Sequence, residues 1–167
     1  MGYSLKVEKL RKVLRERDLD AILISSSENC RYFSGFSGSY GYLLISQIDI
    51  LLATDFRYIE QAAFQAQGYR IERISGDVSW FPEIARSLLL KRIGFEDCDM
   101  SVSIHANFVQ AVSASQANSS ISLVPSSDLV DQMRIIKYDD ELDLLRHAVK
   151  ITDSAFNDVV STGILGM

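Results

Sequence analysis

The sequence predicts an α/β domain in which a mixed β-sheet is flanked by helices on both faces. Two observations predict this class. Short apolar runs of strand length alternate along the chain with segments of helical period, as in layered α/β proteins. Two of the strands, near Tyr42 and Ile50, are separated only by a short polar turn, which favours an antiparallel pair. The sheet is therefore expected to be mixed rather than purely parallel.

The first expected elements are a helix and a buried strand. Charged residues surround an apolar stripe over residues 9–17, which predicts an amphipathic helix. Residues 21–24 form an uninterrupted apolar run, the pattern of a strand covered on both faces. A helical turn is expected over residues 29–33, and a loop punctuated by three glycines follows over residues 35–41.

A hairpin is expected next, from strands at residues 42–45 and 50–53. Thr54 or Asp55 would cap the helix that follows, and Gly68 would end it. The alternation then continues with a strand at 69–74, a helix at 79–91 with Ser79 as its N-cap, a short strand at 93–95, a helix at 103–117 and a last strand at 121–124. Residues 125–128 form a break before a short helix and a long one at 139–160.

Composition excludes several classes of protein. The chain has 167 residues, of which 47% are hydrophobic and 23% charged, which is typical of a globular domain. Its net charge of -5 argues against a nucleic-acid partner, and no run of about 18 apolar residues is available to span a membrane. The N-terminus lacks the apolar core of a signal peptide. Cys30 and Cys98 could form one disulfide, but free thiols in a cytoplasmic protein are the favoured interpretation.

Three motifs follow one another along the chain. They are Asn29-x-x-Tyr32-x-Ser34-Gly35-Phe36, then Thr54-Asp55-x-Arg57-Tyr58, and finally Arg134-x-x-Lys137 before an acidic helix start and Leu142-x-x-Leu145-Arg146-x-Ala148. Together they resemble the N-terminal domain of the creatinase/prolidase family, and within it most closely the Xaa-Pro dipeptidases and Xaa-Pro aminopeptidases. The resemblance covers nearly the whole chain.

The resemblance implies a two-part protein. In that family a small α/β domain with a mixed sheet and a ribonuclease-H-like motif precedes a larger pita-bread metallopeptidase domain. The larger domain holds two divalent metal ions (Mn, Co or Zn), which activate water to hydrolyse Xaa-Pro bonds. We therefore expect residues 1–133 to be the N-terminal domain, and residues 134–167 to be a linker and first helix leading into a catalytic domain that this chain lacks. The segment itself is expected to be non-catalytic and to hold no cofactor.

The resemblance also implies site residues and partners. Dimeric members act on Xaa-Pro dipeptides or short peptides, and the loop at residues 35–41 reaches toward the active site of the neighbouring subunit. There Phe36, Ser37, Ser39 and Tyr40 would limit substrate length and contact the end of the substrate. The composition of this loop predicts that it is exposed, although it carries Phe36 and Tyr40. An ordinary packed turn is the alternative interpretation.

The remaining motif residues are expected to be structural. They are Asn29, Tyr32, Gly35, Asp55, Arg57 and Tyr58. A glycine in the loop would supply a positive φ, and Asp55 would pair with Arg57 while Phe56 or Tyr58 packs inward. Alternatively, this corner shapes a surface shared with a partner subunit.

No metal site is expected in the chain itself. Asp128 and Asp139 have the spacing of the family's metal-binding Asp pair, but the surrounding pattern is missing. His105 and His147 each lack a second His at a ligand spacing.

Other functions remain open on the sequence alone. A creatinase-like amidinohydrolase is the nearest enzyme alternative, and a protein- or peptide-binding module without catalysis is the alternative from another class. A ribonuclease-H-like nuclease would need clustered carboxylates at the strand ends. Glu72 is the only carboxylate within the strands near Ala21, Tyr42 and Tyr69.

Overall fold

The structure, a computed structural model, describes residues 2–115 and 121–163. The chain divides into two compact units, residues 1–130 and residues 131–167, and each is described by itself. The predicted end of the helix at 103–117 lies outside the described residues. The division expected after residue 133 stays a prediction.

The first unit is built on a six-stranded sheet in the order β4-β3-β2-β1-β5-β6. β2 runs antiparallel to both of its neighbours, whereas all other adjacent pairs are parallel. The strands are β1 (Ala21–Ile24), β2 (Tyr42–Ser46), β3 (Ile50–Thr54), β4 (Arg70–Arg73), β5 (Arg92–Phe95) and β6 (Ser122–Pro125). The predicted mixed sheet and its hairpin are therefore confirmed.

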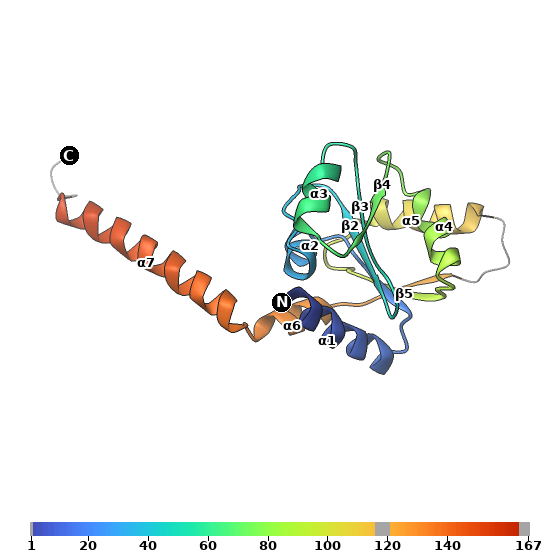
Figure 1. The fold of residues 1–167 in the computed structure, drawn as a ribbon, viewed down its shortest axis with the longest axis horizontal. Coiled ribbons are helices and arrows are strands. Elements are labelled where there is room, and N and C mark those ends of the chain that lie inside the picture. The colour runs from blue at the N-terminus through green and yellow to red at the C-terminus, as the bar shows by residue number, and fades with distance from the viewer. Residues whose placement is uncertain (1, 116–120, 164–167) are drawn as a thin grey trace. The chain divides into compact units, whose positions relative to one another are not determined.

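Helices cover both faces of this sheet (Figure 1), which confirms the predicted layering. On one face lie α1 (Gly2–Glu16), α2 (Ser27–Ser34) and α3 (Ile59–Gln65). On the other lie α4 (Trp80–Ser87) and α5 (Val102–Ala114). Because both faces are covered, the inner strands are apolar on both sides and read as continuous runs in the sequence.

The two faces contribute alternate strand residues to the core. Leu51 and Ala53 of β3 belong to the cluster that contains Phe81 and Phe108 of α4 and α5, whose rings meet edge to face with centroids 5.0 Å apart. Side chains of the opposite parity are also fully buried, namely Ile22, Ile24, Leu43, Ile45 and Leu52. Burial on both faces fixes the pairing register of the strands, since a one-residue slip would move the side chains of each face to the opposite face.

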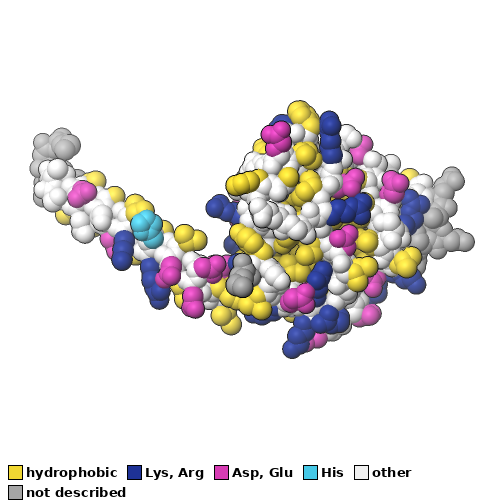
Figure 2. Space-filling view, in the orientation of Figure 1, with side chains coloured by type: hydrophobic (Ala, Val, Ile, Leu, Met, Phe, Trp, Pro, Cys, Tyr) yellow, Lys and Arg dark blue, Asp and Glu magenta, His cyan; other side chains and the backbone are white. Residues whose placement is uncertain are grey.

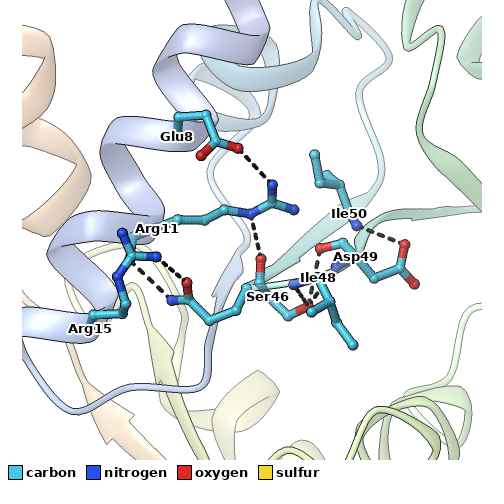
Figure 3. A network of polar contacts seen from close by, with 8 residues as sticks. Glu8, Arg11, Arg15, Ser46, Ile48, Asp49 and Ile50 are labelled. Carbon is cyan, nitrogen blue, oxygen red and sulfur yellow. Dashed lines mark hydrogen bonds and ion pairs between the residues drawn. The ribbon is translucent and has the colours of Figure 1, made fainter.

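Polar contacts hold the β2–β3 turn against α1 (Figure 3). Arg11 donates from Nε to the Ser46 carbonyl over 2.9 Å, and its guanidinium also donates to Glu8 over 2.8 Å. Arg15 donates to the Gln47 side chain over 2.6 Å. Ser46 Oγ accepts from the Asp49 backbone N–H over 2.9 Å, so the turn is closed by its own side chain.

The boundaries of two helices differ from those expected. α3 begins at Ile59, and neither Thr54 nor Asp55 caps it, because Asp55 instead accepts the backbone N–H of Arg57 in a tight turn. α3 also ends at Gln65, before Gly68. α4 ends at Ser87 rather than Lys91, because Leu89 adopts a left-handed φ of 57° and stops the helix.

The C-terminal region contains α6 (Leu129–Ile135) and the long α7 (Asp139–Ser161). Glu141 in the first turn of α7 accepts the backbone N–H of Tyr138 over 2.9 Å. Together with Asp139 and Asp140, it places negative charge at the positive end of the helix dipole, as predicted. None of the helices in the described part of the chain is long and apolar enough to cross a membrane.

The visible face of the first unit carries charges of both signs. Figure 2 shows Lys and Arg side chains interspersed with Asp and Glu and with exposed apolar side chains.

Candidate functional site

The carboxyl edge of the sheet brings the predicted loop and corner together. β1, β3, β4 and β5 are mutually parallel in direction, so they end at the same edge, and antiparallel β2 begins there. Thr54, at the end of β3, donates from Oγ1 to the carbonyl of Tyr40 over 2.6 Å. Open α/β sheets commonly bind ligands beyond this edge, which makes it the candidate site.

The corner is organised by an ion pair between Asp55 and Arg57. Arg57 donates from Nε to Oδ1 over 3.1 Å and from a terminal nitrogen to Oδ2 over 2.6 Å, and its backbone N–H also bonds Oδ1 over 2.9 Å. The hydrogen bonds from Arg57 hold the pKa of Asp55 below its usual value, and the pair raises the pKa of Arg57. The predicted pairing is confirmed.

Hydrogen bonds join the loop to this corner and to α3. Ser39 Oγ lies 2.7 Å from the Tyr58 hydroxyl. The backbone N–H of Ser37 donates to Gln65 Oε1 over 2.9 Å, and Gln61 donates to Ser37 Oγ over 3.1 Å. The loop is therefore held at both of its exposed serines.

Phe36 differs from the expectation of an exposed aromatic residue. Only 1% of its surface is exposed, and its ring packs edge-on against Tyr58, with centroids 6.0 Å apart. The ring lies beneath Gly38, where an added β-carbon would stand 2.2 Å from the Phe36 ring. Phe36 thus supports the loop from below, and Tyr58 is the corner residue that packs inward, since Phe56 is 70% exposed.

Tyr40 is the half-buried aromatic residue of the loop. Its ring meets that of Tyr42 at 6.0 Å, where an aromatic cluster of Tyr42, Trp80 and Phe108 begins. Partial burial, with the nearby Asp55 and Asp77 carboxylates, raises the pKa of Tyr40. The hydroxyl therefore stays protonated at neutral pH and can donate a hydrogen bond.

A cleft of about 520 Å³ opens beside the corner. It is lined by Asp55, Phe56, Arg57, Arg73, Ile74, Ser75 and Gly76. Arg73 is exposed and forms no side-chain hydrogen bond or ion pair with any described residue. Its guanidinium can therefore receive a carboxylate, a pairing that arginine makes in bidentate geometry.

A second cluster at the same edge involves Asn29 and a residue that the sequence did not single out. Glu96 follows β5 and is buried, and it accepts Asn29 Nδ2 over 2.6 Å and the backbone N–H groups of Ser25 and Ser26 over 2.8 Å each. Burial raises the pKa of Glu96, and these hydrogen bonds oppose the rise. The available signal was an acidic residue directly after a buried strand.

Tyr32 and Gly35 lie on the α1 side. The ammonium group of Lys6 stands 4.1 Å from the centre of the Tyr32 ring, a cation–π contact. Gly35 has the predicted positive φ, 75°, at the end of α2. This φ favours glycine, and a β-carbon there would also lie 2.7 Å from the Tyr3 hydroxyl, so the Tyr3 side chain would have to shift.

Among the described residues, no three His, Cys, Asp or Glu side chains lie close enough together to hold a metal ion. Both cysteines are free thiols, and burial raises the pKa of Cys30. The charged and hydrogen-bonding groups described at this edge are of the kinds that orient a polar ligand.

Comparison with known proteins gives a consistent result. A family model described as the creatinase/prolidase N-terminal domain matches residues 6–136. The chain is 35% identical over 158 residues to "Uncharacterized peptidase YqhT" of Bacillus subtilis (strain 168), covering 94% of this chain and 43% of that protein. It therefore spans less than half the length of this relative.

Solved structures agree. An Xaa-Pro dipeptidase from Bacillus anthracis superposes with a TM-score of 0.87 at 33% identity, over 96% of this chain and 43% of that one. The N-terminal domain of the cytoplasmic peptidase PepQ from Mycobacterium tuberculosis H37Rv superposes with a TM-score of 0.70 at 32% identity, over 77% of this chain and 97% of that one.

Proposed function

Because the chain belongs to the creatinase/prolidase N-terminal domain family, we propose that it serves an Xaa-Pro dipeptidase or aminopeptidase as a non-catalytic domain. The similarity to the Bacillus anthracis Xaa-Pro dipeptidase supports this activity for the whole protein. The two divalent ions (Mn, Co or Zn) would be held in the part of the relatives that this chain does not span. The cytoplasmic PepQ relative supports the same compartment.

Within that protein, the loop at residues 35–41 would mediate dimer contact and limit substrate access. The observation that carries this proposal is the double anchoring of the loop, through Thr54 to Tyr40 and through Tyr58 to Ser39. A loop held at both points can present Ser37, Ser39 and Tyr40 to a neighbouring subunit at little entropic cost. Phe36 would act indirectly, by supporting the loop.

The cleft beside the corner suggests how a short peptide would be held. Arg73 and the outer side of Arg57 line it, together with the exposed ring of Phe56. A free peptide carboxylate has the charge and the planar shape that an arginine receives well. Xaa-Pro dipeptides or short peptides therefore suit this edge.

The activity is tested in the full-length protein with paired dipeptides, Xaa-Pro and Xaa-Ala. We expect hydrolysis of the Xaa-Pro member only, its loss in a chelator, and its return when Mn, Co or Zn is added. The 167-residue chain assayed alone should be inactive under the same conditions. A metal-loaded full-length protein that cleaves neither peptide would favour a binding module on this fold.

A further inference from the structure

β4 leaves backbone hydrogen-bonding groups open at one margin of the sheet. Among the strands of the described residues, β4 is terminal and pairs with β3 alone. The Ile74 N–H donates to the Thr54 carbonyl over 2.9 Å, so the backbone groups of residues 70, 72 and 74 point toward β3. Successive residues alternate in direction, and the N–H and C=O groups of Ile71 and Arg73 therefore point outward.

The opposite margin, β6, is a poorer template for another strand. Ser122 and Ser126 donate their N–H groups toward the β5 side, to Lys91 and Phe95, over 2.7 and 3.0 Å. The outward positions are therefore Leu123 and Pro125. Proline has no N–H to donate, so β6 has lost a donor that β4 keeps.

The side chains of β4 carry a self-complementary charge pattern. Arg70 and Glu72 lie on one face, opposite Leu51 and Ala53 of β3, and form an ion pair of 3.3 Å. Their side chains are 45% and 33% exposed. If two copies of Arg70-Ile71-Glu72 run antiparallel with their Ile71 residues opposite each other, a cation faces an anion on each side of Ile71.

We propose that β4 pairs antiparallel with β4 of a second copy of this chain, about a two-fold axis at Ile71. The outward N–H and C=O groups of Ile71 would bond Ile71 of the second copy in both directions. Arg70 would then face Glu72 of the second copy twice, in the non-hydrogen-bonded pairs where side chains lie closest. Registers centred on residue 70 or 72 would oppose like charges, so the charges select one register.

The β4 surface adds a specific contact to the dimer proposed above. The choice of a second copy of this chain as the partner rests on that proposed function. An isologous contact must be self-complementary, which this three-residue pattern satisfies. Unrelated peptides would find the same open backbone groups but not the repeated charge match.

The test uses the 167-residue chain and two charge reversals, Arg70→Glu and Glu72→Arg. Each variant alone would oppose like charges at both pairs, and we expect self-association at least about tenfold weaker by sedimentation velocity. An equimolar mixture restores opposite charges at both pairs, so it should associate like the wild type. Arg17→Glu, an exposed site on α1's C-terminal side, is the matched control for charge and should associate normally.

The outcomes separate this surface from the loop. The β4 pairing would be overturned if both variants self-associated as strongly as the wild type. It would also be overturned if each variant were dissociated alone and the mixture of the two failed to associate. Either outcome would leave the loop proposal standing. A wild-type chain that stays monomeric at every concentration would overturn the β4 pairing as well. Far-UV circular dichroism checks that each variant is folded. Recovery of association in the mixture shows independently that both variants are folded.

Discussion

Asn29 donates from Nδ2 to Oε1 of Glu96 across 2.6 Å and so joins the start of α2 to the carboxyl end of β5. The second oxygen of Glu96 accepts two backbone N–H groups of the segment that leads into α2, from Ser25 and Ser26. One buried carboxylate thus accepts three hydrogen bonds from a single segment of the chain. This contact gives the motif asparagine at residue 29 a structural part in the fold.

Replacing Glu96 by Ala is expected to lower the free energy of unfolding by about 2–4 kcal/mol, because three buried donors lose their acceptor and a cavity remains. Glu96→Gln is the matched control, since its single amide oxygen can still accept the two backbone N–H groups. Urea denaturation at neutral pH measures both. Equal losses in the two variants would contradict the donor-satisfaction argument.

Glu96 also predicts a pH dependence. Its pKa in the folded state is raised above the ordinary 4.5, so the folded protein binds the extra proton more tightly than the unfolded chain does. The stability that this group contributes is full below pH 4.5 and is lost as the pH rises through the folded-state pKa. The unfolding free energy of the wild type minus that of Glu96→Gln should therefore decrease with rising pH. A difference that increases with pH would show that the sign is wrong.

Leu89→Gly is expected to stabilise the first unit by about 0.5–1 kcal/mol. Leu89 has a φ of 57°, which costs an L-residue energy, and its side chain is 83% exposed, so little burial is lost. Leu89→Ala is the control, because alanine keeps the β-carbon and hence the strain. The urea midpoint should rise for the glycine variant only; a rise for both would point to removal of the exposed side chain instead.

Gly38→Ala is expected to destabilise the fold by about 1–3 kcal/mol, because the new methyl group overlaps the Phe36 ring. A double-mutant cycle isolates that contact. In a Phe36→Ala background the same glycine substitution should cost much less. An unchanged cost in that background would mean that the loop backbone, rather than the ring, resists the substitution.

The elements that sequence reasoning predicted correctly are those with strong periodic patterns. The runs at β1, β2 and β3 are apolar on both faces, and the turn at 46–49 has a serine that closes it. The boundaries of α3 and α4 were wrong for local reasons. Asp55 had a competing partner in Arg57, and Leu89 took a left-handed φ inside the segment that was expected to stay helical.

The candidate site was predicted only in part. The order of the motifs brought out the loop and the corner, and the structure joins them through Ser39 and Tyr58. The burial of Phe36 was missed, because the glycines and serines around it suggest exposure and nothing local shows the ring folding back under Gly38. Glu96 was missed because its partners lie about 70 residues away in the sequence.

The central claim is that the loop at residues 35–41 controls which substrates reach an active site, and kinetics of Tyr40→Ala in the full-length protein test it most directly. Ile48→Ala, exposed in the turn at the opposite end of β2, is the matched control. We predict that kcat/KM for Xaa-Pro dipeptides changes relative to longer Xaa-Pro peptides in the Tyr40 variant alone, with metal content unchanged. The same ratio of dipeptide to longer-peptide turnover in wild type and Tyr40→Ala would contradict the account.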